Sequence, residues 1–152
     1  MRIALGCDKA GAELKEAIEA HLTAKGAKVC LFAPDDIEDL DYPVYAQRAA
    51  GAVARGEFDA GVLICGTGAG MAICANKIEG LRAVVCSESY TARMAKEHNN
   101  ANILCFGARV IGRETAKAIV DAWFDAKFQG GRHQRRVDMY KEIEKSDYTS
   151  EK

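Results

Sequence analysis

The residues best suited to chemistry lie where an apolar run meets alternating glycines, in "LICGTGAG" at positions 63–70. Glycines at this spacing let successive backbone N–H groups turn toward one point at the start of a helix, where they can hold an anion or an oxyanion. A thiol among such donors should have a pKa below its usual value of about 8.5, so that thiolate forms near neutral pH. Cys65 is therefore predicted to be a base or a nucleophile, with the Thr67 hydroxyl nearby to deliver protons.

Two other interpretations of this stretch stay open. Cysteine is often buried in strands, so Cys65 could serve packing alone. The glycines also resemble a dinucleotide loop, but that G-x-G-x-x-G motif belongs in the first strand–helix turn, with an acidic residue about 20 positions later. Here the loop follows the third predicted strand, and the glycine spacing differs. We therefore expect no nicotinamide cofactor.

Other candidate residues lie in the second half of the chain. His98 and Asn99 directly precede a predicted strand, and histidine is the side chain best suited to moving protons at pH 7. In "GGRHQRRV", Arg132 and Arg136 are four residues apart and would share a helical face, a spacing suited to binding phosphate. The alternative is that these arginines are only solvated at a helix end.

The remaining histidines, His21 and His133, have no comparable setting and are predicted to be surface or structural residues. No paired cysteine or histidine spacing of the kind that binds metals is present, so no metal is predicted.

Short apolar runs that alternate with helical patterns predict parallel strand–helix units and a sheet covered on both faces. The expected strands lie near 2–7, 28–32, 60–65, 82–87 and 102–106. We therefore expect an α/β protein, a Rossmann-like three-layer αβα sandwich with a five-stranded parallel, flavodoxin-like sheet. Residues 1–152 should form a single domain, with a frayed polar tail over about 146–152.

Helices are expected between and after these strands. The first runs up to Gly26, with Leu14, Ala17, Ile18 and Leu22 on one face. The second begins after "DYP", where Asp41 can cap and Pro43 can sit in the first turn. Later helices should follow the glycine loop and cover about 88–98, 113–128 and 134–144.

Ligands of such sheets bind beyond the carboxyl ends of the strands. The loops at that edge are "GCDKAG", "CGTGAG", "SESY" and "FGAR". Their polar groups are expected to converge on one edge of the sheet, which is therefore the predicted site.

Composition narrows the class of partner. The net charge of -1 gives no basic excess for nucleic acid or an anionic membrane. No apolar run is long enough for a signal peptide or a membrane span. Six scattered cysteines, none in a C-x-x-C pair, indicate reduced thiols used as small hydrophobic residues. We expect a cytoplasmic protein that binds a small molecule or another protein chain.

Several segments together carry a family resemblance: "GCDKAG", "DYPVYA", "ICGTGAGMAICANK", "RAVVCSE", "HNNANILCFGARVIG" and "GGRHQRRV". In this order they closely resemble the ribose-5-phosphate isomerase B / galactose-6-phosphate isomerase family over nearly the whole chain. The resemblance implies an aldose–ketose isomerase of sugar phosphates that uses no metal and no cofactor. It also implies a homodimer or a dimer of dimers, with each active site shared between subunits.

The resemblance assigns roles residue by residue. Cys65 matches the base that moves a proton from C2 to C1 of the sugar through a cis-enediolate. Thr67 matches the hydroxyl that moves protons between the two oxygens of that intermediate. His98 matches the residue that opens the furanose ring. The backbone donors expected to hold the enediolate are those of Gly66, Thr67, Gly68, Ala69 and Gly70. The substrate-binding residues are expected to be Asp8, Tyr42, Arg109, Asn99 from the partner subunit, and Arg132 and Arg136 near the phosphate.

One position departs from the family pattern. Lys9 stands where the ribose enzymes usually carry histidine, and lysine is a flexible point charge that cannot both donate and accept hydrogen bonds. Ribose 5-phosphate is the expected substrate. The alternative substrates for the same reaction are allose 6-phosphate, galactose 6-phosphate or a free aldose. The alternative functions are a non-catalytic sugar-phosphate-binding subunit and a nucleotide-binding or redox module.

Overall fold

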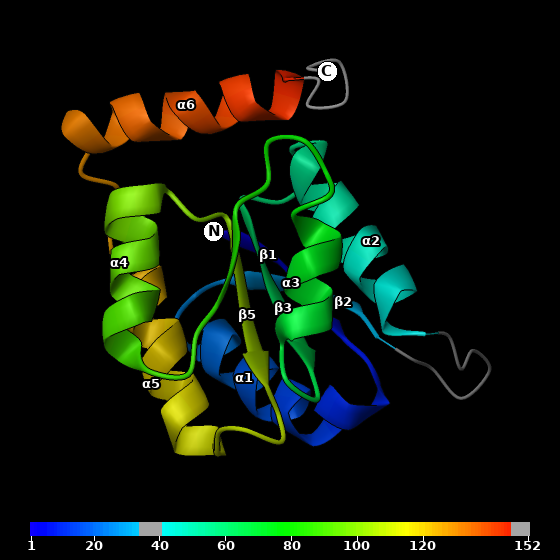
Figure 1. Cartoon of the computed structure of the whole chain (residues 1–152). Helices are drawn as coiled ribbons and strands as arrows, with labels where there is room; N and C mark the ends of the chain where they lie inside the picture. Colours follow the sequence, from blue (N-terminus) through cyan, green and yellow to red (C-terminus); the bar gives the residue numbers. More distant parts are fainter. Residues whose placement is uncertain (34–40, 147–152) are drawn as a thin grey trace.

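The computed structural model describes residues 1–33 and 41–146, and its centre is a five-stranded parallel sheet (Figure 1). The strands are β1 (Arg2–Cys7), β2 (Lys28–Phe32), β3 (Ala60–Cys65), β4 (Ala83–Val85) and β5 (Ile103–Gly107). The predicted parallel sheet is confirmed, although β4 is shorter than expected.

The strand order is β2-β1-β3-β5-β4, so the last two strands are exchanged relative to a flavodoxin-like sheet. β5 lies between β3 and β4, and all five of its residues are buried. Cys65 at the end of β3 therefore pairs with Gly107 at the end of β5. The expected "SESY" loop follows β4 at the edge of the sheet, away from its centre.

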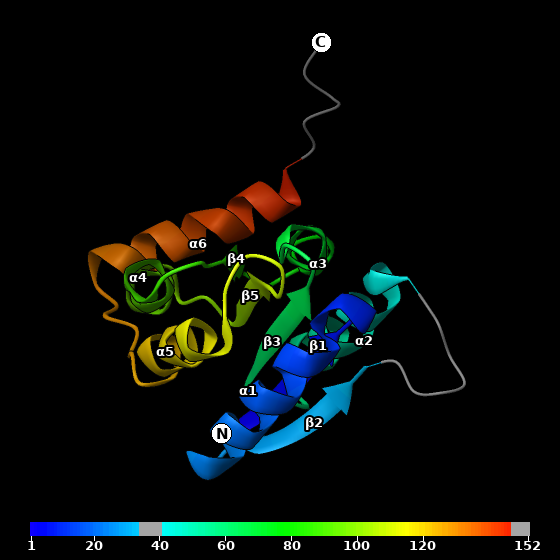
Figure 2. The same ribbon diagram turned by 90° about the horizontal axis from the view of Figure 1, so that it is seen from below.

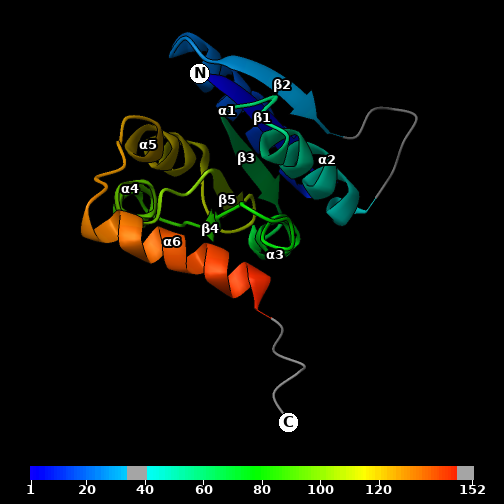
Figure 3. The same ribbon diagram turned by 90° about the horizontal axis from the view of Figure 1, so that it is seen from above.

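Two groups of helices cover the sheet, as Figures 2 and 3 show. One face packs against α1 (Ala12–Ala24), α4 (Ser89–Asn99) and α5 (Arg113–Phe124), and the other against α2 (Tyr42–Ala54) and α3 (Ala69–Ala75). A short 3-10 turn, η1 (Lys9–Gly11), precedes α1. The predicted three-layer sandwich is confirmed.

The helix boundaries differ from the predictions at a few places. Leu14, Ile18 and Leu22 are buried as expected, whereas Ala17 is half-buried. Asp41 occupies the cap position of α2, but its side chain makes no capping hydrogen bond. α5 ends at Phe124, earlier than predicted. Of the expected frayed tail, residues 147–152 lie outside the described residues.

The last helix, α6 (Arg132–Lys145), belongs to neither layer. It lies across the end of the sheet opposite the arrowheads of β3 and β5 (Figure 1) and packs against α4. Only His133 and Val137 of this helix are buried. α6 therefore adds mostly charged, exposed surface at the amino-terminal edge of the sheet.

The six cysteines are all free thiols. Cys7, Cys65, Cys86 and Cys105 are buried, as expected for small hydrophobic residues, but Cys30 is exposed because β2 is an edge strand. Within residues 1–33 and 41–146, no helix combines the length and the apolar character that crossing a membrane requires.

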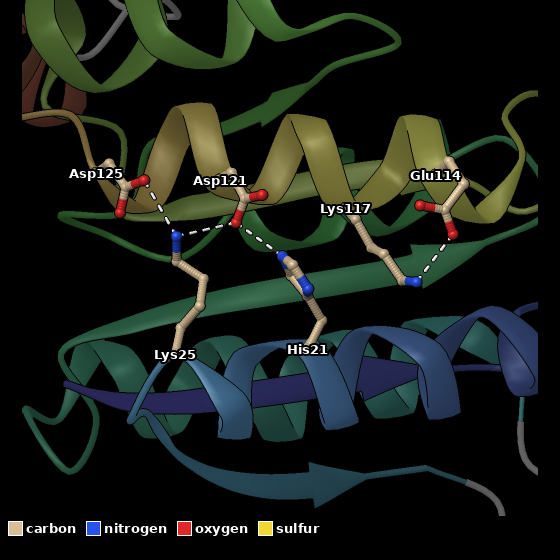
Figure 4. A network of polar contacts seen from close by, with 6 residues as sticks. All are labelled: His21, Lys25, Glu114, Lys117, Asp121 and Asp125. Atoms are coloured by element: carbon tan, nitrogen blue, oxygen red, sulfur yellow. Dashed lines mark hydrogen bonds and ion pairs between the residues drawn. The ribbon is translucent and has the colours of Figure 1, made fainter.

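An ion-pair network joins α1 to α5 (Figure 4). His21 Nε2 lies 2.7 Å from Asp121 Oδ1, and Lys25 Nζ lies 3.0 Å from the same oxygen and 3.1 Å from Asp125 Oδ2. Burial alone would raise the pKa of Asp121, but the hydrogen bonds from His21 and Lys25 outweigh it and lower this pKa. The structural role predicted for His21 is confirmed.

Asp121→Asn should weaken the docking of α1 on α5. We expect the free energy of unfolding at pH 7 to fall by roughly 0.5–1 kcal/mol, because solvent screens these partly exposed pairs. The folded-state pKa of Asp121 is lowered, so its contribution is present above the unfolded carboxyl pKa and is lost as pH falls through the folded pKa. Urea denaturation across this acidic range should show the difference from the parent protein shrinking.

A matched control is Glu114→Gln on the same helix. Glu114 pairs with Lys117 of α5 itself, at 2.9 Å, and should matter less for the contact between the helices (Figure 4). If Asp121→Asn lowered the free energy of unfolding by the same amount at every pH, the electrostatic explanation would be contradicted.

Candidate active site

The Cys65 thiol lies at the carboxyl end of β3, where the backbone turns sharply into α3. Its Sγ accepts a hydrogen bond of 3.2 Å from the Gly68 N–H. Gly68 has φ +81°, and a Cβ there would lie 2.9 Å from the Phe106 backbone. Only glycine fits this left-handed, tightly packed position. The turn thus aims a backbone donor at the sulfur, which stabilises negative charge on it.

The other three buried thiols lie in different electrostatic settings. Burial raises the pKa of Cys7 to about 11 and that of Cys86 to about 11. Burial also raises the pKa of Cys105 well above its ordinary value. These groups stay protonated near neutral pH and serve packing. Cys65 differs from them in accepting a hydrogen bond from the glycine loop, through Gly68 N–H.

Thr67 lies in the same loop with an exposed side chain. Its Oγ1 accepts a hydrogen bond of 3.3 Å from the Ala69 N–H, which leaves the hydroxyl hydrogen to donate outward. Two of the five expected enediolate donors are thus used within the loop, since Gly68 serves Cys65 and Ala69 serves Thr67. Among the described residues, the N–H groups of Gly66, Thr67 and Gly70 have no hydrogen-bond partner, so they can donate to a ligand.

Side chains from other loops meet at this turn. A Cβ on Gly66 would lie 3.4 Å from Arg109 Nη1, and one on Gly70 would lie 2.6 Å from Tyr42 Cε2. The Arg109 guanidinium and the Tyr42 ring therefore cover the loop at two points. Arg109 and Tyr42, both predicted to bind the substrate, thus lie against the loop that follows Cys65.

Asp8 and Lys9 follow β1 at the same edge. Asp8 donates its N–H to the Ile64 carbonyl at 3.3 Å, and its Oδ1 accepts from Gly11 N–H at 3.1 Å. The carboxylate is thereby fixed beside the end of β3. Lys9 is exposed and begins η1, where it lines a hollow shared with Ala108 and Arg113.

Gly107 is a positioning residue that sequence reasoning missed. A Cβ there would lie 2.6 Å from Thr67 Cα and 2.8 Å from the Gly66 carbonyl oxygen. The residues after it bind the loop, since Ala108 N–H donates to the Cys65 carbonyl at 2.8 Å. A glycine at a strand end was visible in "FGAR", but its meaning depends on β5 lying beside β3.

The remaining predicted residues form a second cluster at the opposite edge of the sheet. His98 and Asn99 end α4, and Asn99 Nδ2 donates to Tyr140 Oη of α6 at 2.9 Å. Arg132 and Arg136 lie exposed in the first turns of α6.

The sheet separates this cluster from the thiol. Cys65 pairs with the last residue of β5, whereas His98 is in the last turn of α4, which leads into the first residue of β5, Ile103. The four steps along β5 span about 13 Å at about 3.3 Å per residue. One chain therefore does not bring His98, Asn99, Arg132 and Arg136 to its own Cys65.

His133 is buried, with 4% of its surface exposed, so of the two settings predicted for it, surface or structural, the structural one holds. Its ring stacks on that of His98, with centroids 4.1 Å apart and planes 5° apart. Burial lowers the pKa of His133, and the nearby charges of His98, Arg132 and Arg136 lower it further.

The hydrogen-bond donors around Cys65, at the carboxyl-terminal edge of the sheet, suit an anion. We call this edge the thiol edge. Arg109 and the backbone N–H groups of the loop supply positive charge and hydrogen bonds. Across residues 1–33 and 41–146, His, Cys, Asp and Glu side chains form no group of three that could hold a metal ion.

Comparisons with known proteins match nearly the whole chain. The Ribose/Galactose Isomerase family model matches residues 3–140. Ribose-5-phosphate isomerase B of Escherichia coli (strain K12) is 53% identical over 143 residues, which cover 94% of this chain and 96% of that protein. D-erythrulose-4-phosphate isomerase of Pectobacterium atrosepticum is 43% identical over 139 residues, 91% of each.

Solved structures agree with the sequence matches. The structure of Clostridium thermocellum ribose-5-phosphate isomerase B superposes with a TM-score of 0.91 at 50% identity, covering 95% of this chain and 98% of that one. The family match extends over both edge clusters, from Asp8 to Arg136. On these grounds the chain belongs to the ribose/galactose isomerase family.

Proposed function

We propose that the chain is a metal-independent aldose–ketose isomerase that interconverts ribose 5-phosphate and ribulose 5-phosphate. The observation that carries this is the hydrogen bond from Gly68 N–H to Cys65 Sγ, which holds a proton-abstracting sulfur beside donors for an anion. The relatives named ribose-5-phosphate isomerase B support the choice of substrate. Six free thiols favour a reducing, cytoplasmic location.

The proposed reaction moves two hydrogens. The Cys65 thiolate takes the proton from C2 of the open-chain aldose, and the electron pair forms the C1–C2 double bond as the carbonyl oxygen gains charge. The backbone donors and Arg109 stabilise this cis-enediolate. The Thr67 hydroxyl passes the O2 proton to O1, and the Cys65 thiol then returns its proton to C1. The ketose leaves, and the thiolate is regenerated.

Ring opening and phosphate binding fall to the second cluster, His98, Asn99, Arg132 and Arg136, because these groups suit proton transfer and anion binding. Since the cluster lies at the opposite edge of its own sheet, we infer that it serves the Cys65 loop of another subunit. The assembly is then a homodimer or a dimer of dimers with shared sites.

Exposed apolar side chains support this assembly. Ile73 on α3 is 61% exposed, and Met139 and Ile143 on α6 are 58% and 55% exposed. Apolar surface of this kind is typical of an interface between chains. α3 begins at the Cys65 loop, so a partner docked over α3 would lie next to the thiol.

A second candidate keeps the reaction and changes the sugar. Lys9 lies at the thiol edge in place of the expected histidine, and one relative is named D-erythrulose-4-phosphate isomerase. A tetrose phosphate, allose 6-phosphate, galactose 6-phosphate or a free aldose would fit the same chemistry. The fastest substrate in a panel of these sugars identifies which applies. A pure homomer that turns over none of them would favour the non-catalytic subunit.

Cys65→Ala should lower kcat on ribose 5-phosphate by about 10²–10⁴-fold, the usual contribution of a general base. In D2O, the parent protein should place deuterium on the carbon next to the carbonyl, and the variant should not. Proton NMR measures both, with EDTA present throughout. The control is Cys86→Ala, which removes another buried thiol and should retain activity. Unchanged deuterium uptake by Cys65→Ala would exclude this thiol as the base.

Mixing two inactive variants tests whether sites are shared. Cys65→Ala and His98→Gln should each be inactive alone, but a mixed dimer holds one site with both native residues. Random exchange of equal amounts should restore about a quarter of the parent activity, because half of the dimers are mixed and each has one intact site. The control is two Cys65→Ala preparations exchanged in the same way. No recovery despite confirmed subunit exchange would place both residues in one chain's site.

Gly107→Ala should lower activity strongly while the protein stays folded, because its Cβ would displace the Thr67 backbone and misplace the loop. The matched control is Gly112→Ala, where a Cβ meets nothing within 4 Å. Circular dichroism and kcat measured on both variants test this. Equal activity of the two variants would contradict the role given to Gly107.

A further inference from the structure

A buried histidine lies face to face with the residue proposed to open the sugar ring. The His98 and His133 rings are 4.1 Å apart at their centroids and nearly parallel, at 5°. His98 comes from the end of α4 and His133 from the first turn of α6. His98 is half-buried, whereas His133 is almost fully buried. The inner ring is thus fixed by packing, and the outer ring lies against it.

The surroundings of His133 favour a neutral ring. Arg132 Nε donates toward His133 Nε2 at 3.4 Å, so this nitrogen is an acceptor and the ring proton lies on Nδ1. Nδ1 is buried and has no hydrogen-bond partner among the described residues. An imidazolium would turn a second N–H toward the Arg132 donor. Burial opposes a positive charge on the ring, and the guanidinium groups of Arg132 and Arg136 oppose it as well.

Ring opening needs a histidine with a fixed orientation. As the bond from C1 to the ring oxygen breaks, the O1 hydroxyl loses a proton and the ring oxygen gains one. A neutral imidazole has one acceptor and one donor nitrogen and can take part in both transfers, whereas an imidazolium cannot accept. An unsupported side chain at a helix end can rotate away from the sugar. A flat, uncharged neighbour holds the ring plane and adds no competing charge.

We propose that His133 is a positioning residue, which acts through its stack on His98 to hold that imidazole in the orientation for ring opening. It touches neither the thiol nor the loop that carries the isomerisation. The inference rests on the proposed function for its effect on turnover, but the stack itself can be measured without turnover. It also explains why a buried histidine stands where an aliphatic residue would pack.

The experiment separates ring opening from proton transfer at carbon. Ribulose 5-phosphate has its O5 esterified, so it is open-chain, and exchange of its C1 hydrogen with D2O needs Cys65 but no ring opening. Turnover of furanose ribose 5-phosphate needs both steps. His133→Leu should lower kcat on ribose 5-phosphate by about tenfold to a hundredfold, the cost of a misplaced catalytic group, while C1 exchange persists. His133→Phe, which keeps a flat neutral ring, should restore most of the lost turnover.

A structural control lies one helical turn away. Val137→Ala loosens the same buried face of α6 without touching the stack, and it should change turnover and C1 exchange together. The same parallel loss in His133→Leu would overturn the proposal, as would a Phe variant no better than Leu.

NMR tests the stack directly. In the parent protein the His98 ring protons, assigned with His98→Gln, should resonate upfield because a parallel ring faces them, and His133→Phe should keep this shift. An unshifted His98 in the parent protein would overturn the proposal even if His133→Leu fails to fold. If the parent protein shows the shift but isomerises no sugar phosphate, the proposed function fails, and the role in ring opening fails with it.

Discussion

The hydrogen bond from Gly68 N–H to the Cys65 sulfur needs the chain to reverse within three residues of the end of β3. That turn is possible because Gly68 adopts a left-handed conformation against the backbone of Phe106. The loop can reach that backbone because Gly107 has no side chain. The placement of the thiol thus depends on β5 lying beside β3, which the strand order of the sheet provides.

The parallel direction of the strands explains why the predicted site residues lie at two edges of the sheet. Because β5 runs parallel to β4, α4 must return to the amino-terminal edge before β5 begins, so His98 and Asn99 are left at that edge. α6 crosses the same edge and adds its arginines there. The thiol edge holds donors suited to an enediolate, and the other edge holds groups suited to ring opening and phosphate binding. Association of two chains brings these halves together in our proposal.

Much of the fold could be predicted from the sequence, because apolar runs and helical periodicity are local signals. β1, β2, β3 and β5 lie close to their expected positions, and the glycine loop was identified from its spacing. Strand order is set by packing between distant segments, so the flavodoxin-like order was not correct for β4 and β5. The roles of Gly107 and His133 depend on neighbours distant in sequence, and for that reason neither was visible beforehand.

In our proposal, one sugar phosphate lies between the Cys65 loop of one chain and the cluster of His98 and the α6 arginines in its partner. A crystal structure of the assembled protein with ribulose 5-phosphate bound tests this most directly. We expect the Cys65 sulfur beside C1 and C2 of the sugar, with a partner chain's histidine and arginines at the far hydroxyls and the phosphate. A sugar held entirely by residues of one chain, or bound away from Cys65, would contradict it.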